Sequence, residues 1–566
     1  MKFDDMQYVH LDMQKLKEEI IETVEKFKSA KTFDEADKAF YEYGKICDRV
    51  ETQSALAYIR HTVNTLDEFY DREQEFLDES LPVLSEYFQM MTKALLESPF
   101  RAEFTEKYGE LMFINEEMEL KTFSPEIVAD LQEENKLTTE YEKLLASAQI
   151  DFRGEICTVS QLAPYKQSAD DEIRLQAWTA EGNFYKENKA ELDRLFEELV
   201  HLRDRIAKKL GYEDFTTLGY YRMKRNSYNK ADVAEFRTAV QKYLVPLADK
   251  IYRETAERIG KEYPLNYADS ALMFRSGNPK PCGSADDILK TAKKFYHELS
   301  PETAEFIDFM FENELLDVLS KKGKAQGGYC IEIPDYKAEF IFANFNGTSD
   351  DVETVTHEAG HAFAGYSARD IFPAALRMPT MESCEIHSMS MEFFAWKAAG
   401  EFYGEEADKF KYSHLASAIK FIPYGTMVDH FQHIVYEHPE LTPEQRDNAW
   451  KELTGVYMPW IRLGEIPFYG DGCAWQRQHH IYSSPFYYID YCFAQTVALE
   501  FWALMQKDTN KAWESYKKLV GFAGTKKFTD LVKDSGLGNP FDEKTLKSVC
   551  EEASYWLANF DKSELM

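Results

Sequence analysis

The first part of the chain alternates apolar and charged residues with the period of an α-helix. Over residues 11–147 the apolar positions recur every three or four residues, as at Phe40, Tyr43, Cys47 and Val50. This spacing places apolar side chains on one face of a helix. No cluster of catalytic residue types occurs in the stretch. The pattern therefore predicts a helical N-terminal lobe, residues 1–165, whose role is to shape the molecule.

The pattern changes between residues 150 and 161. Residues with a preference for strands flank Arg153, Gly154 and Glu155, so we predict a β-hairpin there. A polar stretch follows, and helical spacing then resumes over residues 173–210, 232–259 and 285–299. We therefore place a boundary near residue 165 and predict a second, catalytic region over residues 166–566.

Two segments in the middle of the chain have the composition of strands. Residues 327–334, GGYCIEIP, and 339–345, EFIFANF, are rich in β-branched and aromatic side chains. Thr348, Ser349, Asp350 and Asp351 then supply an N-cap and early acidic residues for a helix that begins near residue 350. The sequence thus predicts a mostly α protein with a small β-sheet beside one central helix.

Composition and charge narrow the class of protein. The chain has 566 residues, of which 44% are hydrophobic, which is enough for a large buried core. The formal net charge of −33 argues against nucleic acid or an anionic membrane as a partner. No apolar run reaches the ~18 residues of a membrane span, and the first residues do not resemble a signal peptide. The eight Cys are scattered without a CxxC pair, which favours reduced thiols and a cytoplasmic location.

The predicted central helix carries the chemistry. Residues 350–361 read DDVETVTHEAGH, so that His357, Glu358 and His361 form an HExxH pattern. Residues four apart share a face of a helix, so both His can bind one metal ion while Glu358 reaches a water molecule bound to it. A chance match is expected in about 3% of sequences with this composition, and the alternative is an ordinary solvated helix.

A third ligand is needed, because a catalytic zinc has three protein ligands and one position for water. Residues 380–400 predict a helix that carries Glu382, Glu385 and His387. Spacing alone leaves all three open, and we favour Glu385. Glu392, seven residues later, shares the face of Glu385 and is placed to orient a ligand.

Other patterns have ordinary structural explanations. His430 and His433 lie near Glu437 without a third ligand, so we expect structural histidines. The tyrosines at 487–491 have the spacing of a helix core. Gly327, Gly328 and Tyr329 predict either a mobile loop or an ordinary turn. The strand at 339–345 would be core, or could hold an extended peptide by backbone hydrogen bonds.

Taken together, these residues resemble a known family. Residues 344–351, NFNGTSDD, followed by HEAGH and by Glu385 and Glu392, are similar to the thimet oligopeptidase family, in particular its oligoendopeptidase F branch. Residues 480–491, HIYSSPFYYIDY, are similar to a His- and Tyr-rich segment that lines the active site of that family. The resemblance implies a two-lobed helical zinc peptidase with a deep channel, which cuts short peptides and excludes folded proteins.

The resemblance also implies roles for individual residues. His357, His361 and Glu385 would bind one Zn²⁺ per chain, with Glu358 as the catalytic base. His480 and Tyr491 would contact the substrate carbonyl or the oxyanion, with Tyr488 beside them. Substrate contacts would come from Gly328, Tyr329, Phe342, Ala343, Asn344, Tyr482 and Tyr487. His479 next to His480, and several tyrosines in one segment, leave open which hydroxyl faces the metal.

The sequence therefore predicts a zinc-dependent endopeptidase that hydrolyses internal bonds of short oligopeptides. One alternative is a zinc carboxypeptidase, which needs a fixed cation such as Arg477 for the substrate carboxylate. Another is a non-catalytic peptide-binding module with a closed, structural metal site of four protein ligands. The sequence gives no indication of the oligomeric state.

Overall fold

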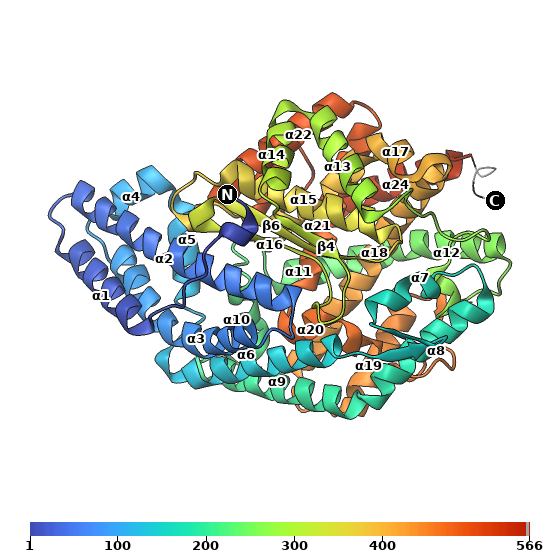
Figure 1. Cartoon of the computed structure of the whole chain (residues 1–566), viewed down its shortest axis with the longest axis horizontal. Coiled ribbons are helices and arrows are strands. Elements are labelled where there is room, and N and C mark those ends of the chain that lie inside the picture. The colour runs from blue at the N-terminus through green and yellow to red at the C-terminus, as the bar shows by residue number, and fades with distance from the viewer. Residues whose placement is uncertain (562–564, 566) are drawn as a thin grey trace.

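The computed structural model describes residues 1–561 and Leu565, and helices make up most of the molecule (Figure 1). The mostly α prediction is confirmed. Side chains of Asp12, Thr32 and Asp67 cap the first three helices by accepting backbone N–H groups. The N-terminal helices are α1 (Met13–Ser29), α2 (Phe33–Val63), α3 (Glu68–Leu96), α4 (Arg101–Tyr108), α5 (Glu110–Glu119) and α6 (Val128–Ala146). Within the described residues, no helix combines the length and the apolar character that crossing a bilayer requires.

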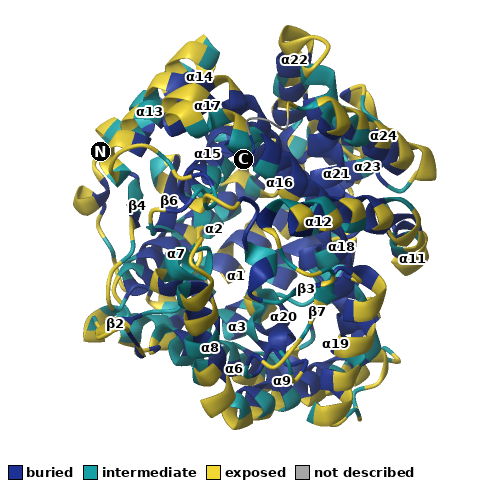
Figure 2. Ribbon diagram, turned by 90° about the vertical axis from the view of Figure 1, so that its right-hand side faces the viewer, coloured by how far each residue is buried: buried dark blue, intermediate teal, exposed yellow. Residues whose placement is uncertain are grey.

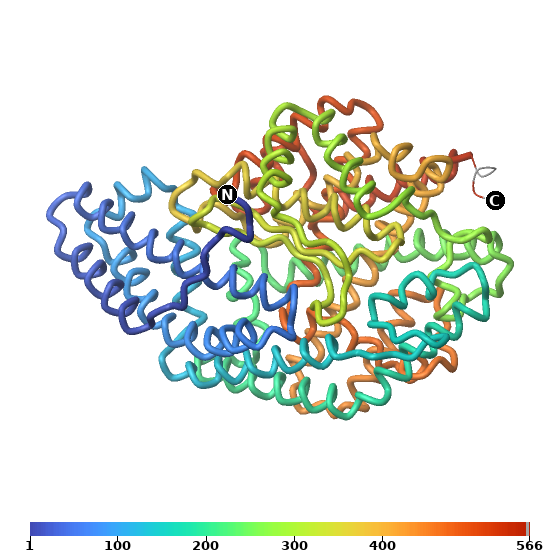
Figure 3. Tube along the Cα trace, viewed as in Figure 1, coloured from blue at the N-terminus to red at the C-terminus, as the bar shows by residue number. Residues whose placement is uncertain are grey.

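Helices α1 to α5 pack around a hydrophobic core of their own. Leu16, Phe40, Leu84, Phe104 and Met112 contribute to it, one from each helix. Figure 3 shows these helices in blue, set apart at one end of the molecule. Helix α6 belongs instead to the larger core, so it connects this lobe to the rest of the chain. The division at residue 165 stays a prediction.

The predicted hairpin is present. Strands β1 (Ile150–Phe152) and β2 (Glu155–Cys157) pair antiparallel, with Arg153 and Gly154 at φ 56° and 87° between them. Positive φ at both central residues is what a tight two-residue turn of this kind requires. The next helices are α7 (Ala163–Lys166), α8 (Asp171–Glu187), α9 (Lys189–Lys209), α10 (Phe215–Arg222), α11 (Lys230–Ala239), α12 (Val245–Ile259), α13 (Ala285–Leu299) and α14 (Pro301–Glu312). The predicted helical run over residues 173–210 is thus two helices, because the chain breaks at Asn188.

A three-stranded sheet precedes the central helix. Its strand order is β4 (Leu316–Leu319), β6 (Ala338–Phe345) and β5 (Tyr329–Ile333). The pairing of β5 with β6 is antiparallel, and that of β4 with β6 is parallel. The predicted strands 327–334 and 339–345 correspond to β5 and β6, whereas β4 was not predicted. A separate two-stranded sheet pairs β3 (Leu265–Asn266) with β7 (Ile461–Arg462).

Helix α15 (Asp350–Ala368) carries the HExxH motif directly after β6. Its start differs in detail from the prediction, because Ser349 makes no capping hydrogen bond. Instead, the Asp351 carboxylate accepts the backbone N–H groups of Asn346 and Gly347, both at 2.8 Å. The acidic first turn therefore ties the helix to the strand that precedes it.

Helix α16 (Met381–Phe394) packs against α15 and α21 in the interior, where Figure 2 shows mostly buried ribbon. The helix predicted over residues 380–400 ends earlier, at Phe394, and a short 3₁₀ turn leads into α17. The remaining helices are α17 (Ala399–Tyr403), α18 (Ala407–Glu437), α19 (Pro443–Tyr457), α20 (His479–Ser483), α21 (Tyr488–Met505), α22 (Thr509–Gly521), α23 (Phe528–Asp534) and α24 (Glu543–Asn559).

Candidate active site

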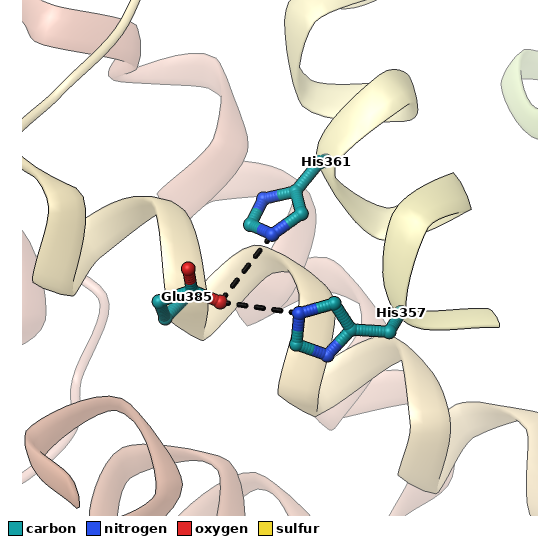
Figure 4. A group of neighbouring side chains, drawn as sticks. All are labelled: His357, His361 and Glu385. Carbon is teal, nitrogen blue, oxygen red and sulfur yellow. Dashed lines mark ion pairs between the residues drawn. The ribbon is translucent and has the colours of Figure 1, made fainter. Parts of the chain in front are cut away.

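Helices α15 and α16 bring three potential metal ligands together. Figure 4 shows His357 and His361 on one helix, both directed at Glu385 on the other. His357 Nε2 lies 3.2 Å from Glu385 Oε2, and His361 Nε2 lies 3.3 Å from the same oxygen. Zinc ligands at 2.0–2.2 Å in a tetrahedron lie about 3.3 Å from one another. The donor set and its spacing therefore fit a zinc ion.

The alternatives to Glu385 lie outside this group. Glu382 accepts a hydrogen bond from the Thr380 hydroxyl at 2.8 Å. His387 is buried, and neither of its ring nitrogens has a hydrogen-bond partner among the described residues. Among those residues, only His357, His361 and Glu385 form a group that could hold a metal ion. The geometry thus selects the residue that spacing had left open.

Gly360 allows the two helices to come this close. A Cβ atom at Gly360 would lie 2.6 Å from the carbonyl oxygen of His387 and 2.7 Å from the Cα of Ser388. Both distances are far below a normal contact, and backbone atoms cannot move aside as a side chain can. The glycine of HEAGH is therefore required by the crossing that brings Glu385 to the histidines.

A second layer of hydrogen bonds holds the candidate ligand His357. Its Nδ1 lies 2.7 Å from Glu392 Oε1, and Glu392 Oε2 lies 2.9 Å from His414 Nε2. The indole N–H of Trp396 donates to His414 Nδ1 at 2.9 Å. Because an indole N–H can only donate, His414 Nδ1 must accept, and its Nε2–H donates to Glu392. Glu392 then accepts from His357 Nδ1–H, which leaves His357 Nε2 free to bind metal.

Sequence reasoning predicted Glu392 in this layer and missed His414 and Trp396. Trp396 lies just beyond α16, and His414 lies on α18. Neither residue has a spacing that relates it to the HExxH motif. Only the packing of α18 against the end of α16 reveals them.

The pKa shifts of Glu385 and Glu358 suit a metal ligand and a general base, respectively. Burial opposes ionisation of Glu385, but His361 and His357 hold the pKa of this carboxyl well below its usual value. Burial raises the pKa of Glu358, and the two histidines oppose this rise. A carboxyl with a raised pKa accepts a proton more readily, as a general base must.

Strand β5 begins beside Glu358. A Cβ at Gly328 would lie 3.3 Å from Glu358 Oε1 and 3.1 Å from Thr354 Cγ2, so a glycine leaves room for the carboxylate. The next residue, Tyr329, stacks on Phe342 at 4.7 Å and shares a hydrogen bond of 2.6 Å with the Thr62 hydroxyl of α2. The strand thus links the site to the N-terminal lobe.

The other predicted substrate contacts on β6 have partners within the protein. Phe342 and Ala343 are fully buried in the core, where Lys324 Nζ donates to the Ala343 carbonyl at 2.6 Å. The Asn344 side chain donates to the carbonyls of Ala325 and Gly327, both at 2.9 Å. These residues support the loop before β5, and the side chains of Phe342 and Ala343 are not brought to a surface that a peptide could touch.

Two tyrosines and one histidine of residues 480–491 reach the site. The Tyr487 hydroxyl donates to Glu385 Oε1, the carboxylate oxygen that does not face the histidines. The Tyr491 hydroxyl lies 3.2 Å from His480 Nε2, and the rings of Tyr487 and Tyr491 are 5.0 Å apart. Both Glu385 and Glu358 influence the pKa of Tyr491, which burial raises. Tyr491 therefore lies near both the candidate ligand and the candidate base.

Of the other two tyrosines predicted near the site, Tyr482 lies in the core and Tyr488 lies beside His480 and Tyr491. Tyr482 is fully buried, stacks on Tyr141 at 3.9 Å and donates to the Leu192 carbonyl at 3.1 Å. Its place is the core, where no peptide can reach it. The ring of Tyr488 lies 5.1 Å from that of His480 and 5.4 Å from that of Tyr491, so it is beside them as predicted, and it also packs against Tyr424. His479, also in this segment, pairs with Glu142 at 3.2 Å.

An unusual backbone conformation directs this segment. Phe486 has φ 67°, a left-handed conformation that bulky residues rarely adopt. Its N–H donates to the Gln432 side chain at 2.8 Å, and its carbonyl accepts from the buried guanidinium of Arg225. Arg225 is also paired with Asp490 at 3.0 Å. Buried partners thus hold the turn that directs Tyr487 toward Glu385, and no sequence pattern predicts these partners.

The predicted structural histidines have protein partners. His430 Nδ1 lies 3.1 Å from the Tyr457 hydroxyl, and His433 Nε2 lies 3.0 Å from the Tyr220 hydroxyl. Neither belongs to a metal-binding group among the described residues.

Two carboxyl groups near the start of α15 have raised pKa values. Asp350 is exposed, yet burial raises its pKa, and Glu353 is half-buried with a pKa that burial raises to about 7. Surrounding protein disfavours the charged form of each carboxyl, which is why their pKa values rise. Both residues lie on α15, ahead of the histidines.

Comparison with known proteins decides the family. The model of peptidase family M3 matches residues 164–271 and 292–550, and that of the peptidase M3 N-terminal domain matches residues 3–123. The chain belongs to peptidase family M3. This confirms the resemblance and makes the protein a metalloendopeptidase.

Solved structures place this M3 peptidase in the oligoendopeptidase F branch. It is 45% identical to an oligoendopeptidase F, with a TM-score of 0.98 and 100% of both chains covered. It is 44% identical to PZ peptidase A, solved with an inhibitor, with a TM-score of 0.98 over 99% of this chain and 100% of that one. An oligoendopeptidase F from Bacillus anthracis str. Ames is 45% identical, with a TM-score of 0.94 over 100% and 99%.

A more distant relative is the oligoendopeptidase F homolog of Borreliella burgdorferi (strain B31). It is 23% identical to this M3 peptidase over 427 residues, which are 71% of this chain and 68% of the relative.

Proposed function

We propose that this M3 peptidase is a zinc-dependent endopeptidase that cuts internal bonds of short oligopeptides. The observation that carries the proposal is the convergence of His357, His361 and Glu385 on one point, with Glu358 beside it. Three protein donors leave one tetrahedral position for water, as catalytic zinc sites do. A structural site would use a fourth protein ligand.

His357, His361 and Glu385 would hold the zinc ion. When bound, zinc supplies Lewis acidity and lowers the pKa of water from 15.7 to roughly 7. Glu358 takes a proton from the attacking water and passes it to the leaving amine. Its burial and its raised pKa support this role.

Tyr491 and His480 are the proposed donors to the oxyanion. They form a pair at 3.2 Å, and Tyr491 lies near both Glu358 and Glu385. Each donor to an oxyanion contributes about 3 kcal/mol to the transition state. Tyr487 has a different proposed role, because its hydrogen bond to Glu385 Oε1 orients the ligand.

We propose that the backbone of the peptide substrate binds along the edge strand β5. It pairs with β6 on one side only and starts at Tyr329, directly after Gly328, which lies next to Glu358. An extended peptide can add to such an edge by main-chain hydrogen bonds. Restriction to short peptides would follow from a deep channel of the kind that the family resemblance implies, and a cytoplasmic location stays a prediction.

The substitution Glu358→Gln tests the proposal. We expect hydrolysis of a quenched fluorescent peptide blocked at both ends to fall by about 10²- to 10⁴-fold, because a general base is lost. Zinc content, measured by atomic absorption, should remain one per chain. Glu235→Gln, on the exposed face of α11, is the control and should cut at the parent rate. Equal rates for Glu358→Gln and the parent would contradict the mechanism, and failure of the parent to cut the blocked peptide would contradict the endopeptidase.

A further inference from the structure

The connection between α15 and α16, residues 369–380, is anchored in the N-terminal lobe of α1 to α5. Leu376 is buried in the hydrophobic core of that lobe, whereas every other buried member of this core lies within residues 11–113 of the described chain. Ile371 and Phe372 are partly buried and pack against the same core. The chain thus leaves the helix with the two candidate histidine ligands, enters the core of another lobe, and returns to begin the helix with Glu385.

Phe372 fits closely against α2. Its ring lies 5.7 Å from that of Phe40 and 4.9 Å from that of Tyr41, both on α2, and 6.0 Å from that of Tyr108 at the end of α4. A Cβ atom at Gly44 would lie only 2.4 Å from Phe372 Cε2, so the absence of a side chain on α2 makes room for the ring. Close packing of this kind opposes movement of the connection along α2.

Arg377 adds an ionic link that joins three elements. Its Nη2 lies 2.7 Å from Asp48 Oδ1 on α2, and its Nε lies 2.8 Å from Glu332 Oε1 on β5. The side chains of Arg377 and Asp48 are both 7% exposed, so solvent ions screen this pair little. Strand β5 is also the strand that begins beside the candidate base, Glu358. Arg377 therefore ties the connection to the N-terminal lobe and to a strand of the site.

Open space borders the connection where these side chains do not hold it. A cavity of about 590 Å³ lies between the lobe and the connection, and Val50 of α2 and Met378 of the connection are among the side chains that line it. Continuous packing is therefore absent on this side. The attachment of the connection to the lobe depends on a few side chains, chiefly Phe372, Leu376 and Arg377.

The position of α16 determines the geometry of the candidate metal site. Glu385 lies four residues after Met381, the first residue of α16, which is about one helical turn. Its Oε2 is 3.2 Å from His357 Nε2 and 3.3 Å from His361 Nε2, both on α15. Metal sites tolerate deviations of about 0.2 Å in ligand distance. A small shift of the first turn of α16 would therefore weaken zinc binding.

We propose that Phe372 and Arg377 are positioning residues for the metal site, through which the N-terminal lobe holds α16 where zinc binding requires it. Both act through the connection to α16, and neither is a metal ligand. This inference rests on the proposed zinc site. Because coupling between two sites is reciprocal, zinc binding in turn holds the connection more firmly against the lobe.

Zinc affinity tests the ionic link. Asp48→Asn keeps the size of the side chain and removes the charge that pairs with Arg377. We expect the zinc dissociation constant of the full chain, measured by chelator competition, to rise by about three- to thirtyfold, the range of couplings carried through packed networks. Glu19→Gln is the matched control, because Glu19 of α1 pairs with Arg49, the neighbour of Asp48 on α2, inside the lobe. Its zinc affinity should equal that of the parent.

A double variant separates positioning from a general loss of stability. Arg377→Gln should raise the zinc dissociation constant at least as much as Asp48→Asn does. The double variant should bind zinc as Arg377→Gln does, because both substitutions break one link. Arg377→Lys keeps the charge and should restore part of the affinity. Affinity is measured well below the unfolding temperature, so a variant that is only less stable keeps the affinity of the parent.

The apolar anchor is tested in the same way. Phe372→Ala removes the ring, and Phe372→Leu keeps part of its volume against α2. We expect zinc affinity to fall from the parent to Phe372→Leu and further to Phe372→Ala. Should Phe372→Ala fail to fold, the comparison of Phe372→Leu with the parent and the variants of the ionic link still decide the inference.

Hydrogen exchange of the unsubstituted protein tests the reciprocal effect. Amide groups of residues 371–377 and of α2 around Gly44 should exchange about threefold or more faster in the zinc-free protein than in the zinc-bound protein. Helix α8, which packs against α7, α9 and β1, is the internal control and should exchange equally in both.

Two results would overturn the inference. One is zinc affinity that stays at the parent value in Asp48→Asn, Arg377→Gln and Phe372→Leu, and the other is equal exchange of residues 371–377 with and without zinc. Neither measurement requires hydrolysis. A parent that binds zinc and cuts no blocked peptide contradicts only the proposed endopeptidase, whereas a parent that binds no zinc contradicts both proposals.

Discussion

The HExxH helix and the segment 480–491 contribute to the same site in different ways. On α15, His357 and His361 face one point because four residues make about one helical turn. In residues 480–491, the chain passes through a short helix, α20, a left-handed residue at Phe486, and the start of α21. Tyr487 and Tyr491 reach the site only because this path is held by Gln432 and Arg225. The helix period places the two candidate metal-binding histidines on one face, whereas side chains distant in sequence position the tyrosines.

This difference predicts which substitutions affect the candidate metal ligands and which affect the tyrosines. The ligand half depends on how closely α15 and α16 approach, since the third ligand comes from the neighbouring helix. The tyrosine half depends on individual hydroxyl groups. Substitutions can therefore separate loss of metal from loss of transition-state contacts.

The largest effect should come from Gly360→Ala. The added methyl meets the backbone of His387 and Ser388 and forces α15 and α16 apart, which costs about 1 to 3 kcal/mol of stability. Because Glu385 moves with α16, we expect zinc loss together with loss of most hydrolysis. Thermal unfolding and zinc content measure the two effects. Gly400→Ala, where nothing lies within 4 Å of the new Cβ, is the control and should keep its metal. A Gly360→Ala variant with full zinc occupancy would contradict the close approach of α15 and α16 at this residue.

The next effect separates the two tyrosines. Tyr491→Phe should lower kcat by about 10²- to 10³-fold with zinc content unchanged, because a proposed donor to the oxyanion is lost. Tyr487→Phe should instead weaken zinc binding, because Glu385 loses the hydrogen bond that orients it. Zinc affinity by competition with a chelator and kcat on a fixed peptide give both values for each variant. If the two variants show the same pattern, the separate roles are wrong.

The smallest effect should come from Glu392→Gln. This carboxylate links His357 to His414, and loss of such an outer partner typically costs 10- to 100-fold in metal affinity or activity. We expect a zinc dissociation constant raised by about that factor, measured by chelator competition. Glu401→Gln, on the outside of α17, should leave the affinity unchanged. Unaltered affinity in Glu392→Gln would limit the site to its three direct ligands.

The sequence predicted the larger part of the site by itself. The helical period placed His357 and His361 on one face with Glu358 next to them, and the β-branched and aromatic residues of segments 327–334 and 339–345 predicted two of the three strands nearby. Strand β4 was not predicted, because its few residues, Leu316–Leu319, carry no distinctive pattern. Glu385 was one of three alternatives by spacing, and the resemblance selected it.

Contacts between residues far apart in the chain depend on the tertiary structure, because local spacing does not determine them. In the folded chain, the Tyr487 hydroxyl donates to Glu385, and Tyr482 lies in the core. His414 is hydrogen-bonded to Glu392, and Trp396 is hydrogen-bonded to His414. The physical reason is that helical period relates residues within one turn or two, over distances set by the backbone itself. Contacts between helices far apart in the chain depend on packing, where one absent Cβ at Gly360 decides whether two helices can meet.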